Sequence, residues 1–582
     1  MKLLSLNKII YYIIFTLILY QPSFAEDAVD IWKKNKQKKI VSEKNVKNKK
    51  TVESTINSTL NGSDINKEKI EIQNTILSNS NEDKMYGLFD PDQNNFTLSM
   101  WSNSKGSEVV NSLKRIAKLN LSKTAEDIFK KTLLSYSFPP ENLDVDEFLQ
   151  HKVDWMIANE KIELLENFLK KNNNFSNKKK IIQYLVDKNI SSSNIKKGCE
   201  KANFISQDIK EPYLEKFKIY CLVFNNKKNQ AQLLHDILKE QGKSDIFFDD
   251  KINYLTEVTS KTDQLIREDN LLNFYLSSIT IKNFNYEPNK KTKLSIWEYL
   301  NSANLIKFDK IKDKEKIKNF ETAANENRLE KVKIFEIYKN IPFDLITLIN
   351  AQNIYQTKEN IESRALIYQK YLLSDNTENQ IKLLFLLKDL FNKDKILNIY
   401  SEFLSEKLKK INKADIPSNY VRAVENNILP EIQSRKGRIK FDDKILHKSR
   451  VVRFYVEPGT PQAKTQKDLD SVYKKIKRNK NYFFSAKDLA LVESLKIDGL
   501  KIPKEIDIIK SAKKYDVPAN LMGLIKNKES GFLALKIVEI IGQDEIYNLD
   551  PETIYFITHL LNQMGLYKFR NEIIISTLPL RV

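Results

Sequence analysis

Apolar residues recur at helical spacing through most of the chain. In residues 107–411, short runs with apolar side chains three or four positions apart alternate with polar joints. In residues 212–224, for example, Leu214, Phe217 and Cys221 share one helical face, and Pro212 falls in the first turn, where its missing N–H removes no hydrogen bond. This pattern predicts a succession of short amphipathic helices.

The predicted helices are joined closely enough to form pairs. Residues 378–391 and 395–408 each carry an apolar stripe, and only Asn392-Lys393-Asp394 separates them. Such a short joint favours antiparallel neighbours, and helix pairs stacked in series build α-solenoids. Because no fixed-period repeat is visible, we expect an all-α fold of the degenerate helical-hairpin superhelix (α-solenoid-like) type.

The helical spacing of apolar residues is interrupted by one loop-containing segment and then resumes. Residues 457–461 read Glu-Pro-Gly-Thr-Pro, which is a loop signal. Further on, Asp550 and Pro551 are suited to begin a helix that ends at Gly565, and the preceding helix ends at Gly542, so we expect these two helices to be consecutive members of one stack. The predicted divisions are a helical repeat-like domain (84–411), a basic, loop-containing segment (412–483) and a C-terminal helical domain (484–582).

The first 25 residues are typical of an export signal. A basic start precedes apolar residues 9–20, and Ser23-Phe24-Ala25 supplies the small residues that a signal peptidase recognises. The apolar stretch is shorter than the ~20 residues that a membrane-spanning helix needs. We therefore predict a cleavable signal peptide (1–25), cut between Ala25 and Glu26, with an uncleaved anchor as the alternative. Periplasmic localisation follows from this prediction.

Residues 26–83 are rich in Lys, Asn, Ser, Glu and Thr, with isolated apolar residues that follow no period. Such a segment buries too little apolar surface to offset the loss of chain entropy on folding. It is therefore predicted to be a disordered tether between the signal peptide and the helices.

The composition disfavours several fold classes, and the net charge indicates a candidate surface for binding an anionic partner. The chain of 582 residues has only 12 glycines, fewer than β-sandwiches, barrels and dinucleotide-binding folds use at their tight turns. The net charge of +20 is carried mostly by Lys, which an AT-rich genome also favours. An anionic partner remains a second interpretation. Its candidate binding residues are Arg435, Lys436, Arg438, Lys474, Lys475, Lys477 and Arg478.

The chain has two cysteines, Cys199 and Cys221, and both lie on the apolar stripes of neighbouring predicted helices. If those helices fold back on each other, the two sulfurs come opposite each other, and an oxidising compartment would join them. We predict a structural disulfide, with two buried free thiols as the alternative. Catalytic redox chemistry is disfavoured because the Cys-x-x-Cys spacing is absent.

The sequence shows no established motif for metal, nucleotide or acyl-transfer chemistry. The four histidines, His151, His235, His447 and His559, have no ligand partner at metal-binding spacing. Glycine-rich phosphate loops and the Gly-x-Ser-x-Gly elbow are also missing from the sequence. We therefore expect no cofactor and no metal.

One segment is similar to the start of the soluble lytic transglycosylase motif. Residues 511–532 end in Lys528-Glu529-Ser530-Gly531-Phe532, and in that family the glutamic acid of Glu-Ser-Gly protonates a glycan linkage in peptidoglycan. The resemblance implies Glu529 as a general acid, a role that requires a protonated carboxyl group in an apolar cleft. The Gly-Leu-Met-Gln segment that follows in the family is absent here. We therefore favour the simpler interpretation that residues 529–531 form an interhelix turn, and keep the enzyme as the alternative.

The mature chain also resembles a group of alphaproteobacterial secreted proteins, some labelled antifreeze-like. The matching features are residues 87–90 with a following Trp101, the cysteine pair, residues 484–491, and the ending that includes residues 550–553 and 564–566. The group has no established activity, so the resemblance implies export and a helical fold only.

Two hypotheses follow from the sequence. The first is a non-enzymatic periplasmic helical scaffold or interaction protein of the cell envelope. Its expected partners are envelope proteins, with peptidoglycan or an anionic membrane surface as alternatives, and nucleic acid is not expected. The second hypothesis is a peptidoglycan-active, lytic transglycosylase-like enzyme that uses Glu529.

Overall fold

The computed structural model describes residues 84–172, 175–176, 178–204, 210–308, 313–429, 437–513, 515 and 517–582. Within these ranges the chain is all-α: it contains helices and three isolated bridges but no β-strand, which confirms the predicted fold class. The predicted signal peptide and tether lie outside the described residues. In the described ranges, every helix falls short, in length or in apolar character, of what crossing a membrane requires.

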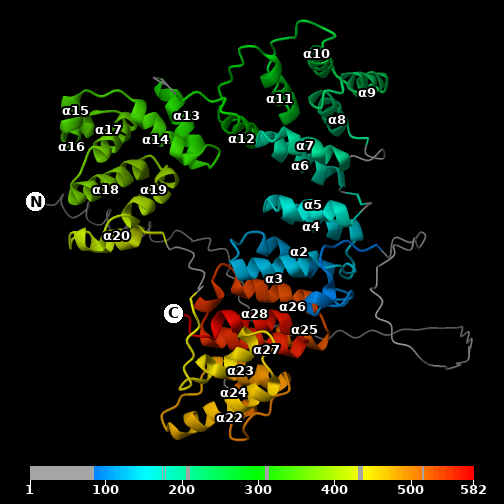
Figure 1. Ribbon diagram of the computed structural model, residues 1–582, viewed down its shortest axis with the longest axis vertical. Coiled ribbons are helices and arrows are strands. Elements are labelled where there is room, and N and C mark those ends of the chain that lie inside the picture. The colour runs from blue at the N-terminus through cyan, green and yellow to red at the C-terminus, as the bar shows by residue number, and fades with distance from the viewer. Residues whose placement is uncertain are drawn as a thin grey trace, which may run out of the picture.

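The first helices follow one another in pairs along one side of the molecule (Figure 1). Helix α4 packs on α5, α6 on α7, α8 on α9 and α10 on α11. The bounds are η2 (Pro91–Asn94), α2 (Gly106–Ile116), α3 (Lys123–Leu134), α4 (Val145–Ala158), α5 (Ile162–Lys171), α6 (Lys178–Ser191), α7 (Ile195–Lys201), η3 (Ala202–Phe204), α8 (Pro212–Phe224), α9 (Lys228–Glu240), α10 (Ile246–Leu255), α11 (Leu271–Thr280) and α12 (Leu294–Ser302). Helix α8 has the bounds that its apolar pattern and Pro212 predict.

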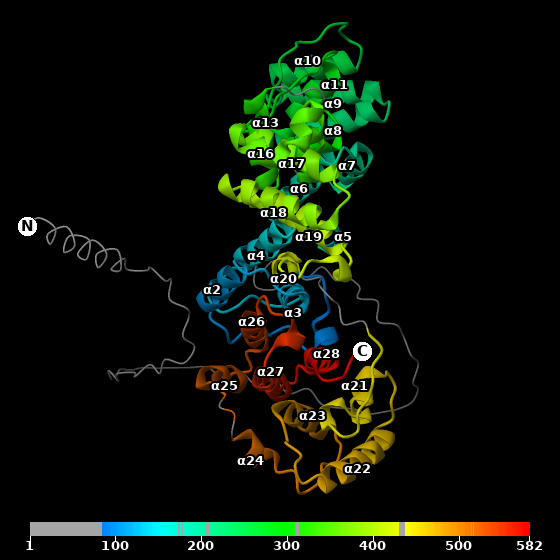
Figure 2. The same cartoon turned by 90° about the vertical axis from the view of Figure 1, so that its left-hand side faces the viewer.

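The next helices turn back and form a second limb (Figure 1), and the view turned by 90° places this limb in front of the first (Figure 2). Together the limbs make an arch. The bounds are α13 (Lys314–Asn325), α14 (Lys331–Asn340), α15 (Leu345–Ile349), α16 (Ala351–Ile354), η4 (Tyr355–Thr357), α17 (Asn360–Leu372), α18 (Thr377–Lys393), α19 (Leu397–Lys409), η5 (Lys413–Asp415) and α20 (Val421–Asn427). Helices α18 and α19 pack on each other, as their short joint predicts.

The C-terminal helices form a lobe below the arch (Figure 1). Their bounds are η6 (Leu446–Lys448), η7 (Arg450–Val452), α21 (Arg453–Val456), α22 (Gln462–Arg478), α23 (Ala486–Ile497), α24 (Ile508–Ala512), α25 (Ala519–Lys526), α26 (Ser530–Ile541), η8 (Ile546–Asn548), α27 (Pro551–Met564) and α28 (Tyr567–Thr577). The end signals act as predicted: the Asp550 side chain accepts hydrogen bonds from two backbone N–H groups of α27, and Gly565 ends that helix with φ 80°.

Helix α26 does not stack on α27 as its chief neighbour, contrary to the expectation from sequence. It packs against α2 and α3, whereas α27 packs mainly on α23 and α28. The backbone N–H of Gly531 donates to the carbonyl of Met100 at 3.1 Å, and that of Ser122 donates to the carbonyl of Gly542 at 2.9 Å. The two ends of the described chain therefore meet in one layer of helices.

Two apolar cores share the C-terminal helices. The larger core extends from the N-terminal helices through the arch and includes Ile557 of α27 and Ile573 of α28. The smaller core lies in the lobe and takes Ile554 and Ile574 from the same two helices. Because α27 and α28 contribute to both cores, they hold the lobe against the base of the arch.

Gly531 of α26 packs directly against Trp101 at the meeting of the two ends of the chain. The indole ring is fully buried and meets Phe148 edge-on at 5.7 Å. A Cβ atom on Gly531 would lie 2.8 Å from the Cδ2 atom of that ring, nearer than side-chain carbons approach one another. Glycine at this position therefore lets α26 lie flat on the segment before α2.

We expect Gly531→Ala to lower the free energy of unfolding by about 1–3 kcal/mol, because the added methyl group overpacks the Trp101 contact. The matched control is Gly523→Ala in α25, where a Cβ atom finds no neighbour within 4 Å. That change should raise stability by about 0.5–1 kcal/mol through its helix propensity. Urea denaturation followed by circular dichroism measures both variants, and equal effects would contradict the assigned contact.

Candidate functional site

The predicted basic cluster is only partly free to bind an anion. Arg435 and Lys436 lie outside the described residues, and Arg438 is exposed. The other four residues lie on α22, which buries Leu469, Val472 and Ile476 and exposes its basic side chains, as the apolar stripe predicts.

Two of the four cluster residues on α22 are already paired. The Lys475 Nζ atom lies 2.9 Å from an Asp443 carboxylate oxygen, and the Lys477 Nζ atom lies 2.7 Å from Glu505. The pKa of Asp443 is lowered, chiefly by its hydrogen bonds from Arg450. Lys474 and Arg478 are exposed, and neither makes an ion pair within the described part of the chain. They are the candidates that remain on this helix.

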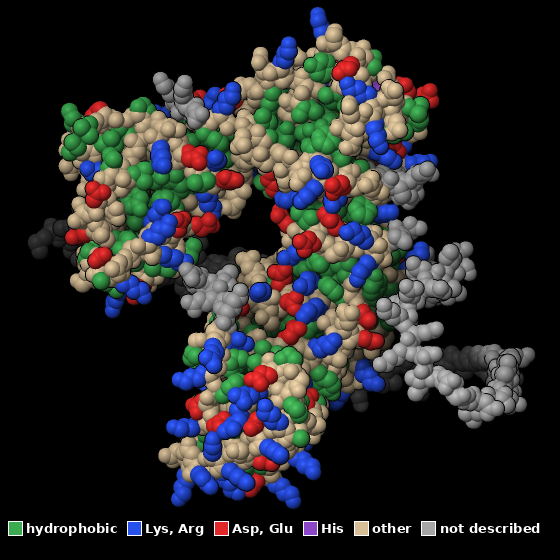
Figure 3. All heavy atoms as spheres, in the orientation of Figure 1, with side chains coloured by type: hydrophobic (Ala, Val, Ile, Leu, Met, Phe, Trp, Pro, Cys, Tyr) green, Lys and Arg blue, Asp and Glu red, His purple; other side chains and the backbone are tan. Residues whose placement is uncertain are grey.

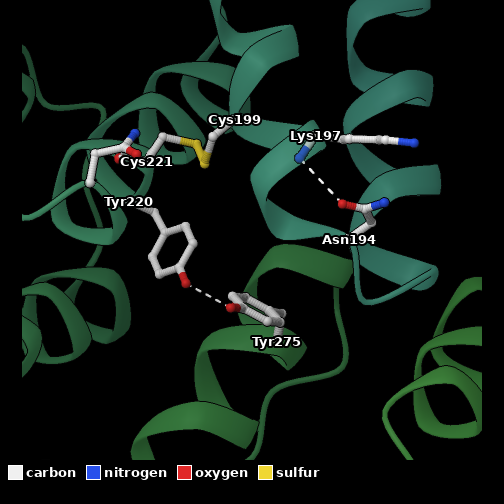
Figure 4. Close-up of a disulfide and its surroundings, with 7 residues drawn as sticks. Asn194, Lys197, Cys199, Tyr220, Cys221 and Tyr275 are labelled. Carbon is white, nitrogen blue, oxygen red and sulfur yellow. Dashed lines mark hydrogen bonds between the residues drawn. A yellow bond between two sulfur atoms is a disulfide. The ribbon is translucent and has the colours of Figure 1, made fainter.

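The two cysteines form the predicted disulfide (Figure 4). Cys199 of α7 and Cys221 of α8 are both buried, and their Cα atoms are 5.4 Å apart. Below the bridge, the hydroxyl groups of Tyr220 and Tyr275 are 2.6 Å apart, which ties α8 to α11. The bridge is enclosed by packed helices, so its role is structural.

Glu529 lies in the turn between α25 and α26, but its side chain is buried. The Asn527 amide nitrogen donates to its Oε1 atom at 3.0 Å, and the Asn527 carbonyl in turn accepts from the Asn103 amide at 2.6 Å. The carboxyl group thus joins a hydrogen-bonded chain between the C-terminal helices and the segment before α2. Burial is the environment that a general acid needs, so a catalytic role for Glu529 stays a prediction.

A cavity of about 590 Å³ opens between α23, α24 and α27 in the C-terminal lobe. This volume is in the range of small-ligand sites. The residues that line it include Glu493, Lys496 and Ile497 from α23, Ile508, Ile509 and Ala512 from α24, and Tyr555 and His559 from α27. The cavity thus combines aliphatic walls with a carboxylate, an imidazole and a phenol.

The polar groups of this cavity are arranged around Glu493. Its Oε1 atom lies 2.7 Å from Nδ1 of His559, and its Oε2 atom, which is buried, meets no hydrogen-bond donor at bonding distance among the described residues. The pKa of Tyr555 is raised by burial first, then by the negative charge of Glu493 and by hydrogen bonding to that carboxylate. The Tyr555 ring also packs on Tyr515 at 5.3 Å. The Oε2 atom has almost no accessible surface, so Glu493 and His559 line the cavity as a hydrogen-bonded pair.

The sequence analysis missed this site because its polar residues are separated along the chain. Glu493 and His559 are 66 positions apart, and only the packing of α23 on α27 brings them together. Two other histidines are paired in the same way, His235 with Asp249 and His447 with Asp488, both at 2.7 Å. In the part of the chain that the structure describes, no group of three or more His, Cys, Asp or Glu side chains is placed to hold a metal ion.

Comparison of the chain with protein-family models, with curated proteins and with solved structures gives no match. Four features of the structure bear on function: the arch, the basic face of α22, buried Glu529 and the Glu493–His559 cavity.

We expect Cys199→Ala/Cys221→Ala to lower the free energy of unfolding by about 3 kcal/mol in the chain-entropy account of a disulfide. Reducing the wild-type chain should cause a similar loss, and the reductant should leave the double variant unchanged. Denaturant unfolding with and without reductant measures these losses, and a thiol-reactive dye counts free thiols. A wild-type chain whose stability does not respond to reduction would contradict the prediction.

Proposed function

We propose that the protein is a non-enzymatic scaffold of the bacterial cell envelope, which acts in the periplasm by binding another envelope protein. The observation that carries the proposal is the arch of paired helices from α2 to α20 (Figures 1 and 2). Curved arrays of helix pairs commonly present an extended surface to a partner. The proposed export signal and the Cys199–Cys221 disulfide agree with an oxidising compartment.

The arch offers a large surface of mixed charge. Figure 3 shows an opening between the limb formed by α13–α20 and the limb formed by α4–α7, with Lys, Arg, Asp and Glu side chains around it. Ion pairs also join the helices of the arch: Lys188 of α6 lies 2.9 Å from Glu160 and 3.0 Å from Glu298 of α12. A rim of this kind suits recognition of a folded protein with complementary charges better than recognition of an apolar ligand.

The basic face of the lobe would add an electrostatic component to partner binding. Residues 437–513 carry 19 Lys and Arg against 10 Asp and Glu. Figure 3 shows basic side chains gathered over the lobe where Figure 1 places α22 and α24. A surface of one sign steers an oppositely charged partner and makes its binding depend on salt. Lys474 and Arg478, at the C-terminal end of α22, are exposed and, among the described residues, unpaired, and we expect them to contribute.

We expect Lys474→Glu/Arg478→Glu to reduce capture of the envelope partner at least about fivefold, because like charges then face the partner's acidic surface. The purified chain is crosslinked reversibly in envelope extract, and its partners are quantified by mass spectrometry. The control is Lys114→Glu/Lys118→Glu, the same charge change on exposed residues at α2. Equal loss in both variants would contradict a specific role for α22, and recovery of glycan without protein would contradict the scaffold.

The enzymatic alternative makes a separate prediction. On the scaffold proposal, the wild-type chain and Glu529→Gln leave purified cell wall equally intact, because neither cleaves a glycan linkage. The amide keeps the shape of the side chain and can still accept from Asn527. Chromatography of soluble muropeptides measures the outcome, with circular dichroism to verify folding. Fragments released by the wild-type chain but not by the variant would establish the enzyme and remove the scaffold proposal.

A further inference from the structure

The cavity between α23, α24 and α27 is polar at its buried end. Glu493 is 8% exposed and Tyr555 is 2% exposed, so both belong to the floor. Lys496, Ile509 and Lys513 line the same cavity and are exposed, so they belong to its mouth. The cavity therefore runs from a carboxylate inside to two ammonium groups outside.

The floor presents hydrogen-bond acceptors. An ionised carboxylate only accepts hydrogen bonds, so the 2.7 Å contact makes Nδ1 of His559 the donor to Glu493. In the neutral imidazole Nε2 then carries no hydrogen and is an acceptor. This acceptor, beside the negative charge of Glu493, favours a bound group that is positively charged and donates hydrogen bonds. A protonated amine supplies three hydrogen-bond donors and a positive charge that pairs with the buried carboxylate.

The walls between floor and mouth are apolar. Ile497 of α23 and Ile508 and Ala512 of α24 line the cavity between these two ends. Hydrocarbon placed between them removes apolar surface from water on both sides. At the mouth, Lys496 and Lys513 favour an anionic group.

From this order of groups we propose that the cavity binds a small zwitterion whose amine and carboxylate are separated by an apolar stretch, such as an ω-amino acid or a short peptide. The amine points inward to Glu493 and His559, the apolar part lies against the isoleucines, and the carboxylate lies between Lys496 and Lys513. This site is separate from the arch and from the α22 face, and it does not depend on the scaffold function.

Three probes of equal chain length test the order of groups. They are 6-aminohexanoate, which carries both charges, hexylammonium, which lacks the carboxylate, and hexanoate, which lacks the amine. We expect 6-aminohexanoate to bind the purified full chain saturably, hexylammonium to bind more weakly and hexanoate to bind weakest. Ligand-observed NMR titration gives the dissociation constants. Failure of 6-aminohexanoate to saturate, or equal binding of hexanoate, overturns the proposal.

Two variants assign the ends of the ligand to residues. Glu493→Gln removes the inner charge and should weaken 6-aminohexanoate at least about tenfold, the effect of losing one charge-assisted hydrogen bond. Lys496→Ala/Lys513→Ala leaves the floor intact and should weaken 6-aminohexanoate several-fold without weakening hexylammonium. The control Lys464→Ala/Lys467→Ala changes exposed lysines of α22 and should leave all three probes unaffected.

Lys496→Ala/Lys513→Ala is not expected to disturb folding, because both side chains are exposed. A change in binding by this variant therefore reports on the ligand contact. Circular dichroism and the unfolding midpoint are recorded for each variant before titration. If Lys496→Ala/Lys513→Ala weakens hexylammonium as much as 6-aminohexanoate, the lysines do not hold the carboxylate, and the assigned orientation is wrong.

Discussion

The packing of α26 on α2 and α3 is the contact on which the rest of the structure depends. It joins residues more than 400 positions apart: Arg115 of α2 lies 2.9 Å from Glu539 of α26, and the Ser112 hydroxyl group donates to the same carboxylate. Nearby, Lys131 of α3 pairs with Glu572 of α28 at 2.7 Å. Because the helices of the arch follow directly from α2 and α3, this one layer fixes where the arch begins relative to the C-terminal lobe.

The local structure could be predicted from the sequence because its causes are local. An apolar stripe, a proline in the first turn and a capping side chain act within one helix, and they correctly placed α8 and both ends of α27. The partner of a helix depends on shape instead. Gly542 and Gly565 suggested that α26 and α27 are neighbours in one stack. In the structure, Gly531 instead lets α26 pack against the Trp101 ring. No local sequence pattern predicts that contact.

The same distinction separates the predicted from the unpredicted functional residues. Cys199 and Cys221 could be paired because they lie on adjacent predicted helices and the sequence contains two cysteines. The sequence located the basic cluster but could not show how much of its charge is free. Asp443 and Glu505, which pair with Lys475 and Lys477, come from other segments of the chain. Glu493 and His559 could not be paired, because a lone carboxylate and a lone histidine on separate helices give no signal in a single sequence.

The cavity and the arch are placed so that binding at one need not distort the other. Helix α24, which supplies the apolar wall, packs mainly on α23, whereas α27 is held by α23, α25 and α28 and by both cores. A molecule that contacts α24 on one side and Glu493 and His559 on the other adds contacts chiefly to α24, the least supported of these helices. The free energy of binding therefore acts locally on the lobe, while the layer of α2, α3 and α26 continues to set the position of the arch.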